Sequence, residues 1–295
     1  MDNISKNSYQ LNFADPPAEY TDPEKSLVRI IPIPYEATTT YRKGTKEAPE
    51  AIIKASTNLE LWDEELSTEP YKAGICTFPP VQCSSAGPRK AITQIYKRVK
   101  SILNPEKFHI FIGGEHSITV GIVRAFCEMY PSLSVLQLDA HADLRNIYQG
   151  SAYNHACVMR RIGEYVSFIQ LGIRSLSKEE TIYIKRKNIA YQNSFQIMQS
   201  DYWKKVLDEK LSRNVYLTID VDVMDPSIMP SVGTPEPGGL SWHKILEIIR
   251  YTTQSKKIVG VDIVEFSPIP QILAPDFLVA KLIYKIIGYI QVKFK

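Results

Sequence analysis

The feature that most constrains this chain is a repeated order, in which a short apolar run leads directly into acidic or histidine residues. Four such runs cover residues 108–112, 133–138, 215–219 and 258–264, and the segments behind them are GGEHS, DAHAD, DVD and EFSP. Short runs rich in Val, Ile, Leu and Phe are typical of buried strands. Because ligands bind beyond the carboxyl ends of parallel strands, we expect these polar residues to meet at one edge of a sheet.

The rest of the chain alternates between strand-like and helix-like segments. Two more apolar runs lie at residues 27–33 and 168–173, and helical patterns lie at 49–54, 89–103, 118–129, 241–250 and 277–290. This alternation favours a mostly parallel sheet covered by helices on both faces. Because no internal repeat or long linker interrupts it, we predict a single domain over residues 1–295, with residues 1–25 as an N-terminal extension.

The acids at the strand ends create an electrostatic problem. Four carboxylates that converge in a partly buried site repel one another strongly, so they need compensating cations. Together with two histidines they form a ligand set that suits Mn²⁺ and is large enough for two ions. Two such ions, about 3.5–4 Å apart, can hold and acidify a water. The predicted metal ligands are His116, Asp139, His141, Asp143, Asp220 and Asp222.

Each of these motifs also has a plain structural interpretation. A single Asp-x-His triplet is common in solvated loops, and a Gly-Gly pair can be an ordinary turn. Only the combination of three acid or histidine clusters, each behind an apolar run, favours a metal site. For Ser117 we prefer a helix cap or a supporting hydroxyl, for Asp225 a structural role in a turn, and for His109 and His243 structural roles.

Composition excludes several classes of protein. Net charge is only +3, from 35 basic and 32 acidic residues, so we expect no nucleic-acid partner. The four cysteines are too few and too scattered for a disulfide scaffold. No apolar stretch reaches the roughly 18 residues of a membrane span, and the first fifteen residues do not resemble a signal peptide. We therefore expect a cytoplasmic protein with no membrane partner.

Three segments, in this order along the chain, resemble the ureohydrolase family of arginases and agmatinases. They are GGEHS at 113–117, DAHAD at 139–143, and the stretch from TIDVDVMDP at 218–226 to GTPEPGG at 233–239. The resemblance runs from about residue 27 to the C-terminus. It implies a three-layer α/β/α domain with a mostly parallel sheet of about eight strands. It also implies a dinuclear manganese centre that hydrolyses a guanidino group to urea and an amine.

The resemblance assigns ligands to two manganese ions. It implies that Asp139 and Asp220 bridge both ions. The remaining ligands are His116 and Asp143 for one ion, and His141 and Asp222 for the other.

The resemblance also implies roles in catalysis and substrate binding. Glu265 matches the carboxylate that pairs with the substrate guanidinium, a role that suits the planar, bidentate geometry of that pair. His155 matches a loop histidine that shuttles protons, and Thr234 matches a threonine that lines the pocket. We expect Asp143 to pass a proton from the attacking hydroxide to the leaving amine. Departures from the family pattern at Glu36, Ala48 and Ala156 concern the loops around the pocket.

The substrate is predicted from acidic residues that arginases have and this chain lacks. Arginases carry an Arg-Asp-x-Asp segment that meets the amino-acid end of arginine, where this chain has Ser175 and Ser177 in place of the acids. Arg145 stands where the family has an asparagine. We therefore predict that the substrate is agmatine, in polyamine synthesis, with N1-aminopropylagmatine as the alternative that the sequence does not separate from it. Guanidinobutyrate, formiminoglutamate and arginine remain further alternatives.

Two other classes of function stay open at this point. A non-catalytic homologue would keep the fold as a binding or regulatory subunit, but we expect it to lack at least one ligand. A related zinc deacetylase has a similar fold, but uses one metal and lacks the paired DxHxD and DxD segments. Family members are often trimers or hexamers, so we expect a homo-oligomer that acts on a small guanidino compound.

Overall fold

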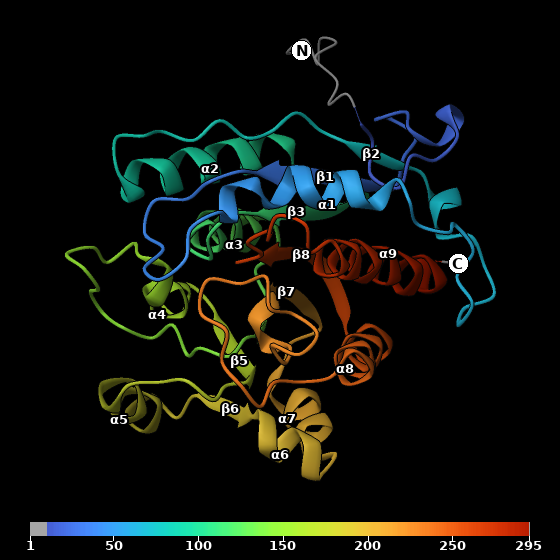
Figure 1. Ribbon diagram of the computed structural model, residues 1–295. Coiled ribbons are helices and arrows are strands. Elements are labelled where there is room, and N and C mark those ends of the chain that lie inside the picture. Colours follow the sequence, from blue (N-terminus) through green and yellow to red (C-terminus); the bar gives the residue numbers. More distant parts are fainter. Residues whose placement is uncertain (1–10, 295) are drawn as a thin grey trace.

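The computed structural model describes residues 11–294, without the side chains of the last two, and forms an α/β protein around one sheet. Eight strands hydrogen-bond in parallel in the order β2-β1-β3-β8-β7-β4-β5-β6 (Figure 1). This confirms the predicted sheet. The strands are β1 (Val28–Ile33), β2 (Ile75–Thr77), β3 (Phe108–Gly113), β4 (Leu133–Leu138), β5 (Ser167–Gly172), β6 (Ala190–Asn193), β7 (Asn214–Asp220) and β8 (Lys257–Val264).

Helices cover both faces of the sheet, so the predicted three-layer α/β/α architecture is confirmed. Buried side chains of α1, α6, α7, α8 and α9 pack on one face, and those of α2, α3, α4 and α5 pack on the other (Figure 1). The helices are α1 (Ala48–Ser56), α2 (Pro88–Ile102), α3 (Ile118–Met129), α4 (Val158–Ile162), α5 (Lys178–Lys187), α6 (Ser194–Gln199), α7 (Tyr202–Lys210), α8 (Trp242–Ser255) and α9 (Ala274–Phe294). Five 3₁₀ turns lie at Ala18–Tyr20, Thr45–Glu47, Pro70–Ala73, His155–Cys157 and Val221–Val223.

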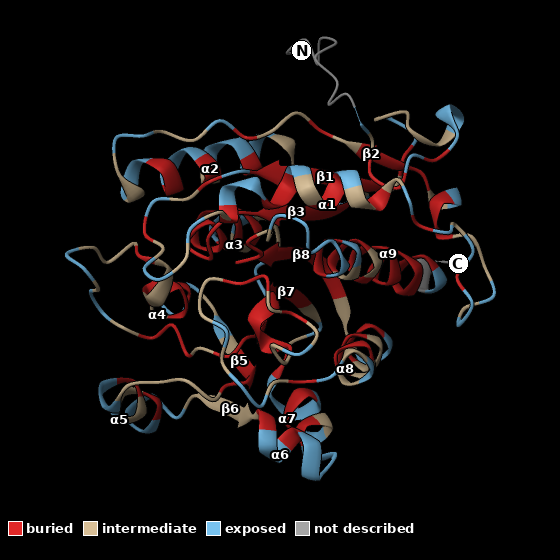
Figure 2. Cartoon of the chain, viewed as in Figure 1, coloured by how far each residue is buried: buried red, intermediate tan, exposed pale blue. Residues whose placement is uncertain are grey.

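The central strands are buried along nearly their whole length because both of their faces are covered. In β1, Ile30 packs into the core on one face and Ile31 into the core on the other, and all six residues of the strand are buried (Figure 2). Helix α8 begins where the sequence predicts it, since the Ser241 hydroxyl accepts a hydrogen bond from the backbone N–H of Lys244.

The segment before β1 packs onto the domain from residue 11 onward. The Asn12 side chain forms hydrogen bonds with the backbone of Ile75 and Thr77, which extends the edge at β2. Phe13 is completely buried in the core. The first ten residues of the predicted N-terminal extension lie outside the described residues. Within the described part of the chain, no helix has the length and apolar character that a membrane crossing requires.

The segment that follows β3 leads into the predicted site and there lies very close to the segment that follows β1. A Cβ atom on Gly114 would overlap the backbone carbonyl of Tyr35, which follows β1. The segments are tied by a backbone hydrogen bond from Glu115 N to Tyr35 O of 2.9 Å. Only glycine fits at this position, because the obstacle is backbone rather than a side chain that could move aside.

We predict that Gly114→Ala lowers the free energy of unfolding by at least ~3 kcal/mol, because forced overlap in a packed interior strains the backbone. Thermal and denaturant unfolding would measure the change. Gly233→Ala is the matched control, since the nearest atom to its added Cβ would be the Arg42 carbonyl oxygen at 3.6 Å. Equal stability of the two variants would contradict the steric argument.

Candidate metal centre

The four clusters found in the sequence come together because their strands are neighbours in the sheet. The strands β3, β8, β7 and β4 lie side by side at its centre. Their carboxyl ends lead to His116, Glu265, Asp220 and Asp139, respectively. Parallel pairing places all four ends at the same edge, and each of these side chains is at least nine-tenths buried. The predicted convergence is therefore present in the fold.

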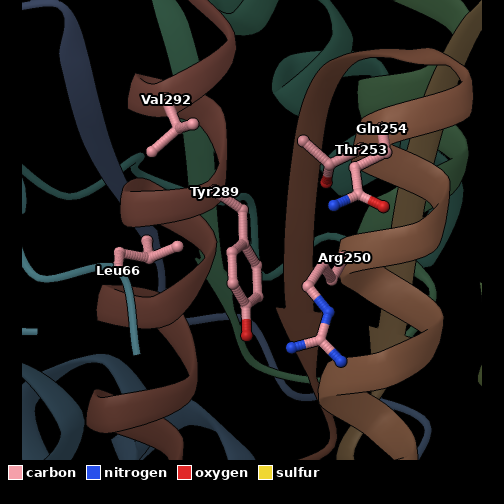
Figure 3. Close-up of a pocket in the computed structure, with 6 residues that line it drawn as sticks. All are labelled: Leu66, Arg250, Thr253, Gln254, Tyr289 and Val292. Atoms are coloured by element: carbon pink, nitrogen blue, oxygen red, sulfur yellow. The ribbon is translucent and has the colours of Figure 1, made fainter. Parts of the chain in front are cut away.

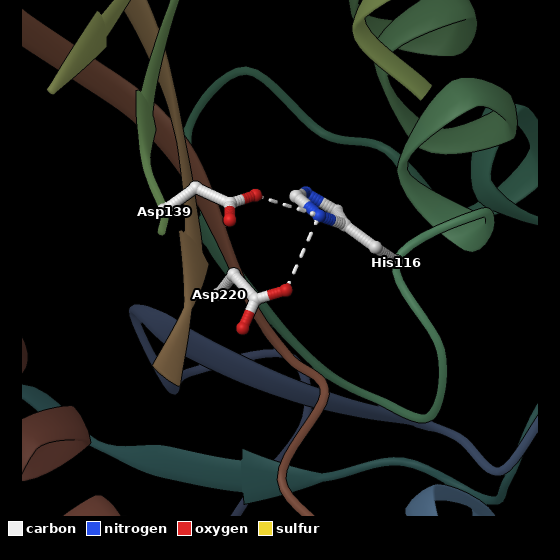
Figure 4. Close-up of side chains that lie close together, drawn as sticks. All are labelled: His116, Asp139 and Asp220. Carbon is white, nitrogen blue, oxygen red and sulfur yellow. Dashed lines mark ion pairs between the residues drawn. The ribbon is translucent and has the colours of Figure 1, made fainter. Parts of the chain in front are cut away.

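A first group of acids surrounds the His116 ring. Its Nδ1 atom lies 3.2 Å from Asp139 Oδ2, 3.1 Å from Asp143 Oδ2 and 3.5 Å from Asp220 Oδ2. Figure 4 shows Asp139 and Asp220 directed at this nitrogen from two neighbouring strands. The side-chain atoms of His116, Asp139 and Asp220 are close enough together to bind one metal ion.

A second group shares Asp139 with the first. Asp139, His141 and Asp222 also present ligand atoms close enough for one ion. The Nδ1 atom of His141 lies 2.9 Å from Asp222 Oδ2 and 3.7 Å from Asp139 Oδ1. The other oxygen of Asp222 accepts a hydrogen bond of 3.0 Å from the backbone N–H of Ala140, so the two strand ends hold each other in place.

The hydrogen bonds around His116 leave its Nδ1 atom available to bind a metal ion. The Thr218 hydroxyl donates its only proton to Asp262 Oδ1 at 2.6 Å. His116 Nε2, 3.0 Å from the same hydroxyl, must therefore be the donor to it. Nδ1 is left buried without a hydrogen-bond partner among the described residues, facing three carboxylates. A metal ion at this point would satisfy both the lone pair and the acids.

Without a metal ion, Asp139 and Asp220 bind protons near neutral pH, whereas His141 holds the pKa of Asp222 down at about 2 despite its burial. Burial, together with the charges of Asp222 and Asp143, raises the pKa of Asp139 to about 7. Burial and the neighbouring acids also raise the pKa of Asp220 well above its ordinary value. Burial opposes the charge on His141, but the adjacent Asp222 outweighs it and raises the pKa of His141 to about 11. These shifts are what uncompensated negative charge in a buried site produces.

Buried polar residues inside the strands orient the acids. The Gln137 side-chain amide donates to Asp139 Oδ2 at 2.6 Å, and Gln170 donates both to Gln137 and to the Ala142 carbonyl. The sequence analysis did not single out Gln137, Gln170 or Asp262, although each is a polar residue inside an otherwise apolar run.

Glu265 and Asp143 have unusual backbone conformations. Both adopt the left-handed region, with φ of 61° and 51°, respectively. Glu265 Oε1 accepts a hydrogen bond of 2.7 Å from the backbone N–H of His116. Burial raises the pKa of Glu265 to about 8. Non-glycine residues held in this region are frequent at functional sites, because the surrounding structure must impose them.

His155 lies beside the loop that follows β1. Its Nδ1 atom is 3.1 Å from the Thr38 hydroxyl, and its ring meets Tyr148 edge-on with 6.3 Å between ring centroids. Burial lowers the pKa of His155, whereas the charge of Asp143 opposes that shift. His155 is thus placed near the acid cluster through a loop that the sequence analysis had not connected to it.

The loop that contains Thr234 runs beside Glu265. A bridge between Val232 and Phe266 and a hydrogen bond from Ser267 N to Ser231 O at 2.7 Å join the two segments. Thr234 itself is half-buried, and no hydrogen bond links its side chain to the described acids of the cluster.

The two substituted serines have other partners. The Ser175 hydroxyl donates to Glu236 Oε1 at 2.9 Å, and this carboxylate lies 4.0 Å from His141 Nε2. Ser177 caps α5 through a reciprocal pair of hydrogen bonds with Glu180. The Arg145 guanidinium lies over the Tyr148 ring, 4.7 Å from its centroid. Glu236 is a further acid at the site that the sequence analysis had not singled out.

A separate surface cavity of about 230 Å³ lies between α8 and α9 (Figure 3). Its charged residue, Arg250, is paired with Glu65. The cavity is near the C-terminal end of α8, which leads into the start of β8, and so lies toward the opposite edge of the sheet from the acids. We assign it no part in the chemistry. Its lining residues are Leu66, Arg250, Thr253, Gln254, Tyr289 and Val292.

The fold and site together define a class, namely α/β/α proteins whose parallel sheet gathers acids and histidines at one edge in groups that could hold metal ions. Comparison with known families narrows this class. Residues 26–288 match the arginase family, and the chain belongs to that family. Its members are hydrolases that act on guanidino compounds. The resemblance found in the sequence is thereby confirmed.

Individual relatives cover almost the whole chain. A Synechocystis protein named N(1)-aminopropylagmatine ureohydrolase is 40% identical over 272 residues, which is 90% of this chain and 89% of that protein. An agmatinase of Pyrococcus horikoshii is 35% identical over 268 residues, covering 88% and 90%. The crystal structure of a Thermoplasma volcanium agmatine ureohydrolase superposes with a TM-score of 0.86 at 33% identity, covering 96% and 95%.

We predict that Asp139→Asn weakens the binding of both metal ions by more than ~100-fold, because loss of a shared ligand exceeds the effect typical of supporting residues. Metal content after dialysis would measure this. Asp225→Asn is the matched control, since Asp225 binds the backbone N–H groups of Gly238 and Gly239 outside the cluster. An Asp139→Asn protein that keeps two ions would refute the shared-ligand assignment.

We also predict that Mn²⁺ expels at least about one proton per chain from the metal-free protein at pH 7. Asp139 has a pKa of about 7 without metal, and bound metal requires the carboxylate form. Since the raised pKa values keep protons on the acids, metal affinity must fall as the pH falls. Titration calorimetry in buffers with different ionisation enthalpies would count the protons. Binding heats that do not depend on the buffer would contradict this prediction.

Proposed function

We propose that this protein is a manganese-dependent ureohydrolase that cleaves N1-aminopropylagmatine, with agmatine as the second candidate substrate. The observation that carries the hydrolase assignment is the pair of three-residue groups that share Asp139. The choice between the two substrates rests on relatives, because several of the similar proteins are named N(1)-aminopropylagmatine ureohydrolase. The comparisons thus favour the alternative over agmatine, which the sequence analysis had put first.

We propose that six side chains hold two Mn²⁺ ions. Asp139 would be shared, since it lies near both histidines. Asp220, 3.5 Å from His116 Nδ1, would be shared as the family resemblance implies. When bound, the two ions would supply a water of lowered pKa and compensate the charge of the acids. The full set is His116, Asp139, Asp143 and Asp220 for one ion, and Asp139, His141, Asp220 and Asp222 for the other.

The remaining residues would bind and protonate the substrate. The Glu265 carboxylate is buried and adjoins His116, so it can pair with a guanidinium and hold the guanidino carbon close to the ion-binding acids. Asp143 can accept a proton from the attacking water and pass it to the leaving nitrogen. His155 can relay a second proton from solvent to the leaving amine. Thr234, beside Glu265, would line the pocket. The products are urea and the amine that remains.

The surroundings of the site favour a substrate without an α-amino acid head group. The Ser175 hydroxyl is engaged by Glu236, and Ser177 is engaged in capping α5. Arg145 is stacked on Tyr148. A zwitterionic head group would therefore lose water here without gaining the paired acids that arginases offer, and burying an unpaired charge is costly.

We further propose that the enzyme is a cytoplasmic homo-oligomer, either a trimer or a hexamer. The four cysteines are free thiols, as a reducing compartment requires. Three large apolar side chains of the α6–α7 region, Phe195, Met198 and Tyr202, are more than half exposed. Contact with a second subunit would remove them from water.

We predict that kcat/KM with saturating Mn²⁺ decreases in the order N1-aminopropylagmatine, agmatine, L-arginine. The kcat/KM for L-arginine should be at least ~100-fold lower than that for agmatine, because each ~1.4 kcal/mol of uncompensated desolvation lowers kcat/KM by a factor of ten. A urea-release assay with guanidinobutyrate included would measure it.

Three outcomes of this assay would be decisive. A higher kcat/KM for agmatine than for its aminopropyl derivative would restore the agmatinase assignment. A kcat/KM for L-arginine equal to that for agmatine would refute the argument from Ser175 and Ser177. No urea from any guanidino compound would refute the proposed function itself.

A further inference from the structure

The Glu115 carboxylate is buried and accepts hydrogen bonds on both of its oxygens. Oε2 accepts the backbone N–H groups of Ala37 and Thr38, each at 2.6 Å. Oε1 accepts the hydroxyls of Thr38 at 2.8 Å and Ser117 at 2.5 Å. Glu115 is 0% exposed. Four donors on one buried carboxylate hold the loop after β1 against the segment after β3.

The Thr38 hydroxyl has a fully determined set of partners. A hydroxyl carries one proton and two lone pairs. The proton goes to Glu115 Oε1, and one lone pair accepts the backbone N–H of His155 at 3.0 Å. The remaining lone pair faces His155 Nδ1 at 3.1 Å. Because the hydroxyl has no second proton to donate, Nδ1 must be the donor in this contact.

We propose that Thr38, held by Glu115, is a positioning residue that fixes neutral His155 as the tautomer protonated on Nδ1. The other ring nitrogen, Nε2, then carries the lone pair. Nε2 has no hydrogen-bond partner within the described part of the chain. A carboxylate or carbonyl that fixes one ring nitrogen in this way is a general means of setting the reactivity of the other.

The assignment matters for proton transfer, and in this respect it rests on the proposed function. Neutral His155 would accept one proton from water at Nε2 and become an imidazolium. It would then release that proton to the leaving amine nitrogen and return to its starting form. With the opposite tautomer Nε2 would already be protonated, and the neutral ring would have to rotate before it could accept a proton.

The test is ¹⁵N–¹H NMR of ring-labelled histidine in the intact enzyme, with diamagnetic Zn²⁺ in place of Mn²⁺. The chain has five histidines, and a His155→Gln spectrum would assign the signals of His155. We expect Nδ1 protonated and Nε2 unprotonated in the wild type. Thr38→Val should abolish this preference, whereas Thr38→Ser, which keeps the hydroxyl, should restore it.

Kinetics of urea release with Mn²⁺ complete the test. Thr38→Val should lower kcat by about 10–100-fold, within the range of acid–base catalysis, while KM and metal content stay near wild type. Thr39→Val is the matched control, because the Thr39 hydroxyl binds Glu36 at 3.2 Å and does not contact His155. It should leave both the tautomer and kcat unchanged.

The outcomes separate this proposal from the proposed function. An Nε2-protonated His155 in the wild type would overturn the proposal even if Thr38→Val did not fold. An unchanged tautomer and kcat in a folded Thr38→Val protein would overturn it as well. If the wild type released no urea, the proposed function would fail, but the spectra would still decide the tautomer.

Discussion

The structure depends on the mutual repulsion of acids at one sheet edge and on the means to compensate it. Four neighbouring parallel strands end together, and their buried acids raise one another's pKa values. Such a cluster is unfavourable unless protons or cations occupy it. The apolar layers on both faces of the sheet supply the stability that this edge lacks. The fold therefore concentrates charge at the carboxyl ends and apolar contact everywhere else.

A surrounding layer of hydrogen bonds determines where protons reside. Thr218 donates to Asp262, which leaves His116 Nε2 as a donor and Nδ1 free to face the acids. Thr38 donates to Glu115, and this makes His155 Nδ1 a donor in turn. In both cases a threonine hydroxyl that donates its proton to a carboxylate sets a histidine tautomer. Such hydroxyls do not touch the reacting atoms, yet they decide which nitrogen can bind or accept a cation or proton.

The comparisons and the site answer different parts of the functional question. The family match makes the chain a hydrolase of guanidino compounds, and the acid groups explain how it could hold metal ions. The end of the substrate that does not react is less constrained, because Ser175, Ser177 and Arg145 all have partners within the protein. This explains why residue patterns disfavoured an arginine head group but did not separate agmatine from its aminopropyl derivative, which both lack the α-carboxylate.

The sequence by itself determined the central strands and the acids behind them, because apolar runs with polar ends reflect burial and strand direction locally. It did not reveal β2 and β6, which are edge strands of three and four residues, nor α4 to α7, whose patterns are short or weak. Only the tertiary structure decided the left-handed backbone of Asp143 and Glu265. It alone joined His155 to Thr38 across 117 residues and Thr38 to Glu115 across 77. Such contacts form when distant loops pack together, and no local periodicity encodes them.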